Sequence, residues 1–266
     1  MFFRKRKRRL LPSNGEQVGL REFLLDVYGR LYRHFGPRHW WPADTPFEVI
    51  VGAILTQQVS WGNVEKAINN LKERQYLSVA GILALSHEEL GLLIRPTRYF
   101  NQKAQRLKDV CRVIREEFGD DVDAFLKEET GALRNRLLKV RGVGKETADS
   151  ILLYAAGRPV FVIDSYTHRI LQRLGRAHGR ETYDELQCLF ESHLPRDVTL
   201  FSEYHALLVA LGHHTCLKSR PQCSGCPLAG VCVYQARLAA GATRAEASND
   251  VPGAIAGRRS GRVPTG

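Results

Sequence analysis

Apolar residues recur every three or four positions along most of this chain, which is the spacing of residues on one face of an α-helix. This periodicity predicts helices over residues 18–34, 46–57, 61–74, 77–83, 86–93, 101–117, 121–126, 131–139, 146–156, 165–174, 181–193 and 199–212. Only the short stretch PVFVID, residues 159–164, alternates in the manner of a strand. The pattern therefore predicts an all-α fold.

Two terminal segments lack the helical periodicity. Residues 1–15 contain the basic run RKRKRR, and residues 237–266 are rich in glycine, arginine and proline. Segments of this composition bury too little apolar surface to offset the entropy of ordering, so we expect a disordered basic arm and a disordered tail. The remainder of the 266 residues, in a chain that is 44% apolar, suffices for one large domain or two small helical ones.

The net charge of +11 lies mostly at these ends. Residues 4–9 supply +6 and the tail from Arg237 adds +3, which leaves about +2 for the body. Affinity for nucleic-acid phosphates would then depend on the tails and on local patches, unless the tails are simply solvated. The sequence has no 18-residue apolar run and no apolar segment after its basic start, so we expect no membrane partner and a cytoplasmic, nucleoid-associated location.

Four cysteines near the C-terminal end have the spacing C-x6-C-x2-C-x5-C: Cys216, Cys223, Cys226 and Cys232. Without a secretory signal, thiols this closely spaced indicate one shared cofactor rather than disulfides. Four thiolates suit both tetrahedral zinc and a [4Fe-4S] cluster. Only one pair has CxxC spacing, and the wider gaps let the loop surround a larger object, so we favour iron–sulfur over zinc. Cys111 and Cys188 lie in apolar helical patterns and are interpreted as buried small hydrophobes.

Residues 130–157 predict two helices joined by a tight turn. Gly142, Val143 and Gly144 form the turn, and the second helix starts at about Lys145 and Thr147. Glycine allows positive φ and a close approach of the backbone to another surface. The N–H groups of the turn and of the new helix then form a site for a DNA phosphate. An ordinary pair of antiparallel helices is the alternative.

Three motifs in this order resemble one family. The hairpin LLKVRGVGKETA, the segment VIDSYTHRIL and the cysteine pattern are similar to the endonuclease III superfamily of helix-hairpin-helix DNA glycosylases, over about residues 17–236. The resemblance implies a six-helix barrel over 46–175 and a discontinuous helical domain, 16–45 with 176–236, that carries the [4Fe-4S] cluster. It also implies that double-stranded DNA with an extruded damaged base binds between the domains, and we expect a monomer.

The resemblance implies that Asp164, in the V-D motif, is catalytic. Cleaving an N-glycosidic bond builds positive charge on the sugar, and a fixed carboxylate stabilises that charge or orients the attacking water. An N-cap role for Asp164 at the next helix is compatible with this.

Family members that also cleave the strand carry a lysine eighteen residues before the catalytic aspartate, and in this chain that position is Glu146. A carboxylate cannot form the imine that such a lysine makes with the sugar. Lys145 is adjacent, but neighbours on a helix point about 100° apart, so we expect it to face a phosphate or solvent. With Asp164 and Glu146 as the candidate catalytic residues, the hypothesis is a monofunctional glycosylase with water as the nucleophile.

The segments HWWP and ILTQQVSWGNVEKAI resemble the methylpurine-releasing branch, the 3-methyladenine DNA glycosylase III group. The candidate base-pocket residues are Trp40, Trp41, Gln57, Gln58 and Trp61. Indole faces attract a cationic alkylated purine and stack on bases, although core packing is the alternative for each tryptophan. One glutamine would fill the gap left by the flipped base, and the sequence does not choose between Gln57 and Gln58.

Lys218 and Arg220 lie between the first two cysteines and are candidates to dock DNA, unless the cluster loop only fixes the C-terminal region. The predicted function is therefore excision of alkylated purines, of the 3-methyladenine and 7-methylguanine type, without strand cleavage. One alternative is a glycosylase, with or without AP lyase activity, for oxidised pyrimidines or mismatched bases. Another is a non-catalytic iron–sulfur DNA-binding protein.

Overall fold

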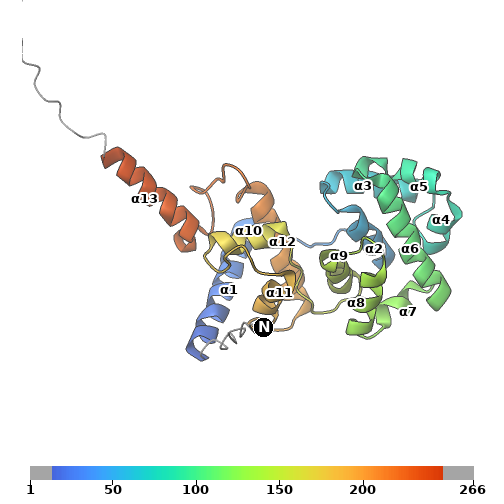
Figure 1. Ribbon diagram of the computed structural model, residues 1–266, viewed down its shortest axis with the longest axis horizontal. Helices are drawn as coiled ribbons and strands as arrows, with labels where there is room; N and C mark the ends of the chain where they lie inside the picture. The colour runs from blue at the N-terminus through green and yellow to red at the C-terminus, as the bar shows by residue number, and fades with distance from the viewer. Residues whose placement is uncertain (1–13, 248–266) are drawn as a thin grey trace, which may run out of the picture.

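The computed structural model describes residues 14–247, and this part of the chain contains helices but no strands (Figure 1). The α-helices are α1 (Asn14–Phe35), α2 (Pro46–Leu55), α3 (Trp61–Glu73), α4 (Val79–Ala84), α5 (His87–Leu93), α6 (Phe100–Phe118), α7 (Val122–Lys127), α8 (Thr130–Lys139), α9 (Lys145–Ser150), α10 (Ser165–Arg173), α11 (Tyr183–Glu191), α12 (Val198–His214) and α13 (Val233–Ala247). Two 3-10 turns, η1 (Arg95–Thr97) and η3 (Ala229–Val231), and one π-turn, η2 (Ile151–Ala155), complete the set. The all-α prediction is confirmed.

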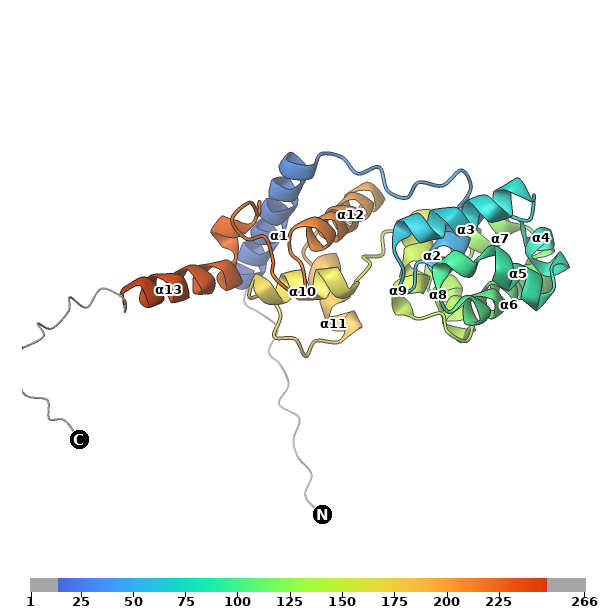
Figure 2. The same ribbon diagram turned by 90° about the horizontal axis from the view of Figure 1, so that it is seen from above.

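The helices form two lobes, each around its own apolar core (Figures 1 and 2). Helices α2 to α9 enclose the first core, where side chains such as Ile54, Leu71 and Leu107 are buried. The second core lies among α1, α10, α11 and α12, and in it the rings of Phe161 and Phe190 stack with centroids 3.9 Å apart.

The division between the cores falls near residue 160 rather than at 175. Ile163, Ile170 and Leu171 pack in the second core, because the extended segment 159–164 leaves the first lobe and delivers α10 onto α12. The predicted end of the barrel domain at residue 175 therefore differs from the observed packing.

The second lobe is assembled from distant parts of the sequence. Helix α1 packs on α12, where the hydroxyl of Tyr204 donates to the carbonyl of Leu24 at 2.8 Å. Residues 36–45 then carry the chain across to α2 in the other lobe (Figure 2). A long-range contact of this kind leaves no trace in local periodicity.

Side-chain caps fix where several helices begin. Ser86 with Glu89 and Thr182 with Glu185 form reciprocal capping boxes at α5 and α11. Each box satisfies N–H groups that have no partner within the helix, which stabilises its first turn.

Helix α9 runs directly into the π-turn η2, in which the N–H of Ala156 donates to the carbonyl of Ile151 at 3.0 Å. Leu152 packs in the first core and Leu153 in the second. The turn therefore connects the two lobes, and π-turns inside helices frequently mark functional sites.

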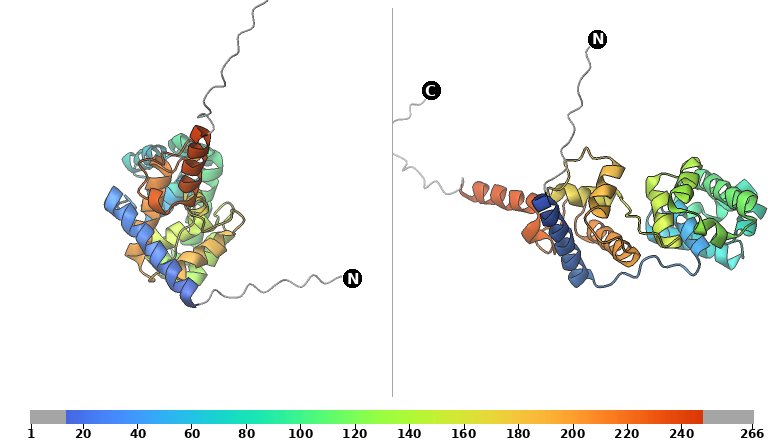
Figure 3. Two further views of the ribbon diagram at one scale, coloured as in Figure 1. Left: turned by 90° about the vertical axis from the view of Figure 1, so that its left-hand side faces the viewer. Right: turned by 90° about the horizontal axis from the view of Figure 1, so that it is seen from below.

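Two expectations from the sequence need correction. Helix α13 extends to Ala247 and projects from the second lobe (Figure 3), so residues 237–247 of the expected disordered tail are helical. Cys188 is exposed on α11, whereas Cys111 is buried as expected. The expected disorder of residues 1–13 and 248–266 lies outside the described residues.

None of the helices in residues 14–247 has the length and apolar character needed to cross a bilayer.

The contact between α10 and α12 leads to a prediction about Gly212. A Cβ at this position would lie 2.4 Å from the ring of Tyr166 on α10, so we expect Gly212→Ala to lower the free energy of unfolding by about 1 to 3 kcal/mol. Gly62 on α3 has nothing within 4 Å of its Cβ position and is the matched control, with a gain of up to about 1 kcal/mol for Gly62→Ala. Denaturant unfolding would measure both, and equal effects in the two variants would contradict this packing.

Candidate functional site

The turn between α8 and α9 has the geometry of the predicted hairpin. Gly142 has φ +87°, and a Cβ there would lie 2.1 Å from Nε of Arg106. The positive φ therefore favours glycine at this position, and a larger residue would also displace the Arg106 side chain. Gly142 and Gly144 are exposed, whereas the side chains of Val143 and Thr147 are buried, so only the backbone of these two residues is available to a ligand.

The structure distinguishes the two glutamines. Nε2 of Gln57 donates to the carbonyl of Gly142 at 3.1 Å and to Oγ1 of Thr147 at 2.9 Å, and its Oε1 accepts a bond from Arg106. Gln57 therefore joins α2 and α6 to the hairpin. Gln58 is exposed and has φ +56°, so its side chain projects from a sharp turn.

A buried lysine holds the end of α2, just before Gln57 and Gln58, in place. Nζ of Lys103 donates to the carbonyls of Leu55 at 2.8 Å and Thr97 at 2.6 Å. Burial, assisted by the charge of Arg106, lowers the pKa of Lys103 to about 8. Through Thr97 the same lysine anchors a second left-handed turn, where Tyr99 has φ +44° and is 61% exposed.

Asp164 lies between the two lobes as the N-cap of α10. Its Oδ1 accepts a hydrogen bond from the backbone N–H of Thr167 at 2.7 Å, so the predicted capping role is observed. Its side chain is only 10% exposed. The N-cap bond fixes the carboxylate and leaves Oδ2 for other partners.

Two residues that sequence reasoning missed surround Asp164. Nε2 of His205, on α12, lies 3.7 Å from Oδ2 of Asp164, and Nδ1 of His205 lies 2.7 Å from the hydroxyl of Tyr154 in the π-turn. A histidine inside the apolar stretch YHALLVAL was the available signal, but nothing local linked it to a residue 41 positions earlier.

Glu146 is the second carboxyl group near Asp164. Desolvation by the atoms around its carboxyl group, and secondarily the negative charge of Asp164, raise the pKa of Glu146 to about 7, although the residue as a whole is exposed. Near neutral pH Glu146 is therefore divided between its protonated and ionised forms.

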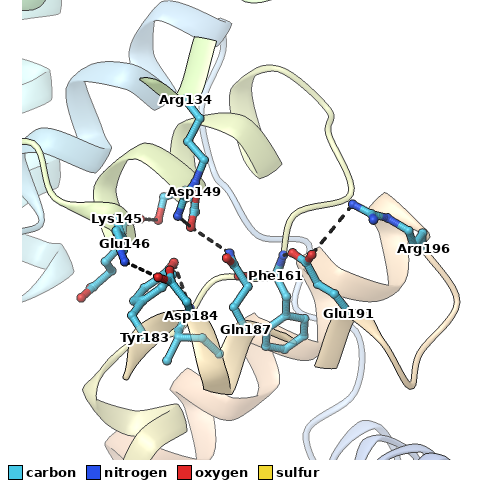
Figure 4. Close-up of polar contacts among 12 residues, drawn as sticks. Arg134, Lys145, Glu146, Asp149, Phe161, Tyr183, Asp184, Gln187, Glu191 and Arg196 are labelled. Atoms are coloured by element: carbon cyan, nitrogen blue, oxygen red, sulfur yellow. Dashed lines mark hydrogen bonds and ion pairs between the residues drawn. The ribbon is translucent and has the colours of Figure 1, made fainter. Parts of the chain in front are cut away.

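The amine of Lys145 is paired with a different carboxylate. Its Nζ lies 2.5 Å from Oδ2 of Asp184 at the start of α11, as Figure 4 shows. The expectation that Lys145 faces a phosphate or solvent must include this ion pair, which lies on the surface and is open to exchange with another anion.

One turn further along α9, a polar network joins the hairpin to α11 (Figure 4). The fully buried carboxylate of Asp149 accepts two bonds from Arg134, at 2.6 and 2.9 Å, and one from Nε2 of Gln187 at 2.8 Å. Gln187 also donates to the carbonyl of Phe161 at 2.8 Å. Burial, followed by the nearby charge and hydrogen bond of Asp149, raises the pKa of the Tyr183 phenol.

The three tryptophans gather into one cluster beside this site. Trp40 and Trp61 have ring centroids 4.6 Å apart, and Trp41 lies 5.4 Å from Trp61 and 5.3 Å from Tyr154. All three are partly exposed, and Trp41 and Trp61 also pack against the first core. The predicted base-pocket tryptophans thus combine core packing with partial exposure, and their base-binding role stays a prediction.

All four predicted cysteine ligands line one cavity at the end of α12. No three of the His, Cys, Asp or Glu side chains described in the structure are placed to hold a single metal ion. Burial and the neighbouring cysteines raise the pKa values of Cys223 and Cys226, and the guanidinium of Arg173 donates to Sγ of Cys216 at 3.0 Å. These raised pKa values favour neutral thiols in the absence of a cofactor, while four soft sulfur donors around one cavity beside a cation fit a thiolate-bound cofactor.

The loop between the cysteines is tied to α10. Arg169 donates to the carbonyls of Cys216 and Gly212, both at 2.9 Å, and Arg173 donates to the carbonyls of Leu217 and Lys218. Lys218 and Arg220 are exposed, and Arg220 has φ +54°. Both predicted cations thus project from a loop that is fixed to the helix carrying Asp164 at its N-terminus.

The chain is similar to known DNA repair proteins. Residues 51–196 match the model of the HhH-GPD superfamily base excision DNA repair proteins. A relative from Methanocaldococcus jannaschii, named "Putative DNA repair glycosylase MJ1434", is 46% identical over 213 residues, which cover 80% of this chain and 96% of the relative.

Two solved structures share the fold. The 3-methyladenine DNA glycosylase MagIII of H. pylori, bound to 1,N6-ethenoadenine, is 30% identical with a TM-score of 0.63 over 73% of this chain and 96% of that one. An endonuclease III–DNA complex has a TM-score of 0.72 at 23% identity, over 83% and 98% of the two chains. The chain therefore belongs to the HhH-GPD superfamily of base excision DNA repair proteins.

Proposed function

We propose that this DNA glycosylase is monofunctional and hydrolyses the N-glycosidic bond of alkylated purines flipped from duplex DNA. The observation that carries the proposal is that the group beside Asp164 at the hairpin exit is the carboxyl of Glu146, while the neighbouring amine of Lys145 is paired with Asp184. No amine is thereby offered to the sugar at this position, and water is the remaining nucleophile.

The two carboxyl groups have separate roles in this mechanism. As the bond from C1′ to the base breaks, its electron pair leaves with the base, and the ionised Asp164 stabilises the positive charge on the sugar. Water forms the new bond to C1′ and gives its proton to Glu146. A base whose pKa lies near the working pH suits this transfer, as the value of about 7 for Glu146 does.

The cluster of Trp40, Trp41 and Trp61 supports the assignment of a flat, aromatic base as the substrate. Indole faces attract a cationic alkylated purine by about 0.5 to 2 kcal/mol and stack on a base by about 1 to 3 kcal/mol. The relative MagIII has been solved with a modified purine, 1,N6-ethenoadenine, bound to it. A cationic base is already a good leaving group, which fits a site that holds no dedicated acid.

DNA would be held on both sides of the site. The backbone of Gly142 to Lys145 meets phosphates on one flank, and Lys218 and Arg220 meet them on the other. Gln58 is the residue that fills the gap left by the flipped base, because Gln57 is already bonded to Gly142 and Thr147 whereas Gln58 projects into solvent.

Cys216, Cys223, Cys226 and Cys232 would hold a [4Fe-4S] cluster. Their convergence on one cavity supports one shared cofactor, and the wide gaps in their C-x6-C-x2-C-x5-C spacing favour a cluster over zinc. When bound, the cluster would cross-link the loop that positions Lys218 and Arg220.

Base release tests the reaction and its substrate together. We expect the protein to liberate free 3-methyladenine or 7-methylguanine from methylated duplex DNA without nicking the strand. Asp164→Asn, which keeps an N-cap acceptor, should fold normally and lose about 10³-fold or more of this activity. Duplexes with uracil, thymine mismatches, 8-oxoguanine or oxidised pyrimidines belong in the same assay, and release of these bases alone would refute the alkylpurine assignment.

Glu146 makes stability depend on pH in a definite direction. Its pKa is raised in the folded protein, so the folded state loses stability as pH rises from about 4.5 to about 7, and the loss is complete above pH 7. Glu146→Gln removes this loss and should therefore raise the melting temperature at pH 8.5 while leaving it unchanged at pH 4.5. A stabilisation of equal size at both pH values would show that Glu146 titrates normally.

Glu146→Gln should also slow excision about 100-fold.

A further inference from the structure

The carboxylate of Asp164 has one oxygen that the capping bond does not use. Oδ1 is bonded to the N–H of Thr167, while Oδ2 faces Nε2 of His205 at 3.7 Å. The side chains of Asp164 and His205 are only 10% and 8% exposed. Little solvent therefore reaches the Asp164 carboxylate to hydrate it, and the imidazole is a close polar neighbour of Oδ2.

His205 is itself held in one orientation. Its Nδ1 lies 2.7 Å from the hydroxyl of Tyr154, and that hydroxyl lies 3.2 Å from the carbonyl of Ser202. Nε2 of His205 is buried and has no hydrogen-bond partner among the described residues. The carboxylate of Asp164 is the charged group that faces this nitrogen, at 3.7 Å.

The direction of the Tyr154 hydroxyl is coupled to the tautomer of His205. In the neutral ring, a hydroxyl that donates to Nδ1 leaves the proton on Nε2, facing Asp164, whereas a hydroxyl that donates to the carbonyl of Ser202 pairs with a proton on Nδ1. In the charged ring, both nitrogens carry hydrogen and the hydroxyl donates to Ser202. Burial lowers the pKa of His205, against the opposing effect of Asp164, which favours the neutral ring. The tautomer with its proton on Nε2 and the charged ring both direct an N–H toward Oδ2.

We propose that His205, oriented by Tyr154, is a positioning residue that holds Asp164 in its ionised form and in the geometry needed beside the sugar. This role rests on the proposed function, since it assumes that Asp164 is the catalytic carboxylate. Like a second-sphere partner in other sites, His205 acts on the reaction only through the group it contacts.

The charges around the pair give His205 its effect. Glu146 is the like-charged neighbour of Asp164, and two nearby carboxylates disfavour each other's ionised form. Asp164 raises the pKa of His205 against the effect of burial. Burial, then the charges of Asp164 and Glu203, raise the pKa of Tyr154, and burial, then Glu203, raise that of Tyr28 on α1. The ring of His205 is the polar group that faces Asp164 from α12 whether or not Glu146 is charged.

The experiment is the pH dependence of single-turnover base release, using a lesion that the wild-type protein excises. Four proteins are compared, all with Glu146→Gln so that its own titration near pH 7 is absent: the parent, His205→Leu, His205→Gln and Tyr154→Phe. Glutamine keeps a donor that leucine lacks. Duplex affinity and melting temperature are measured for each.

We expect His205→Leu to move the acid limb of the rate profile upward by about one pH unit, because the ionised carboxylate of Asp164 loses the polar ring that faces its Oδ2. On the acid limb it should then be up to about tenfold slower than the parent, and at pH 9 nearly equal to it. His205→Gln should restore the parental profile, and Tyr154→Phe should shift it by a smaller amount in the same direction. If His205→Leu proves unstable, the Tyr154→Phe shift alone decides the question.

A rate lowered by one factor at every pH would show a merely structural role and overturn the proposal, as would identical profiles for the leucine and glutamine variants. Asp164→Asn separates this failure from failure of the proposed function. Full activity in Asp164→Asn would refute both, whereas an inactive Asp164→Asn with an unshifted His205→Leu would refute only the role of His205.

Discussion

The pairing of the buried Asp149 carboxylate with Arg134 and Gln187 is the constraint on which the arrangement of the site depends. Asp149 is fully buried, and removing one partner of such a pair costs about 3 to 5 kcal/mol because a charge is left unpaired. Its partners come from α8 and α11, so the pairing fixes the hairpin of one lobe against a helix of the other. Glu146 lies one turn earlier on the same short helix, and its relation to Asp164 is fixed by the same contact.

A second set of contacts reaches Asp164 from the opposite side. Arg169 and Arg173 tie the cysteine loop to α10, and the same helix begins at Asp164. These contacts fix the loop to the helix that begins at Asp164. In the proposed function, the loop would therefore keep Lys218 and Arg220 at a constant distance from the Asp164 carboxylate.

Local patterns were sufficient to predict most of the helices, the glycine turn and the cap at Asp164, because each depends on residues close in sequence. Contacts between distant helices were not predictable in the same way. Examples are the pairing of Lys145 with Asp184 and the approach of His205 to Asp164. Gln57 and Gln58 are the same residue type and adjacent in sequence, and only the backbone conformation gives their side chains different directions. Helix α13 was missed because its Ala-rich sequence has no apolar stripe.

The central claim is that a carboxyl group, not an amine, stands beside Asp164, and borohydride trapping tests it most directly. A Schiff base between the protein and an abasic sugar becomes a stable covalent adduct on reduction. The account predicts no adduct for the wild-type protein and a new adduct for Glu146→Lys, whose amine would take the position next to Asp164. A wild-type adduct that is lost in Lys145→Ala would contradict it.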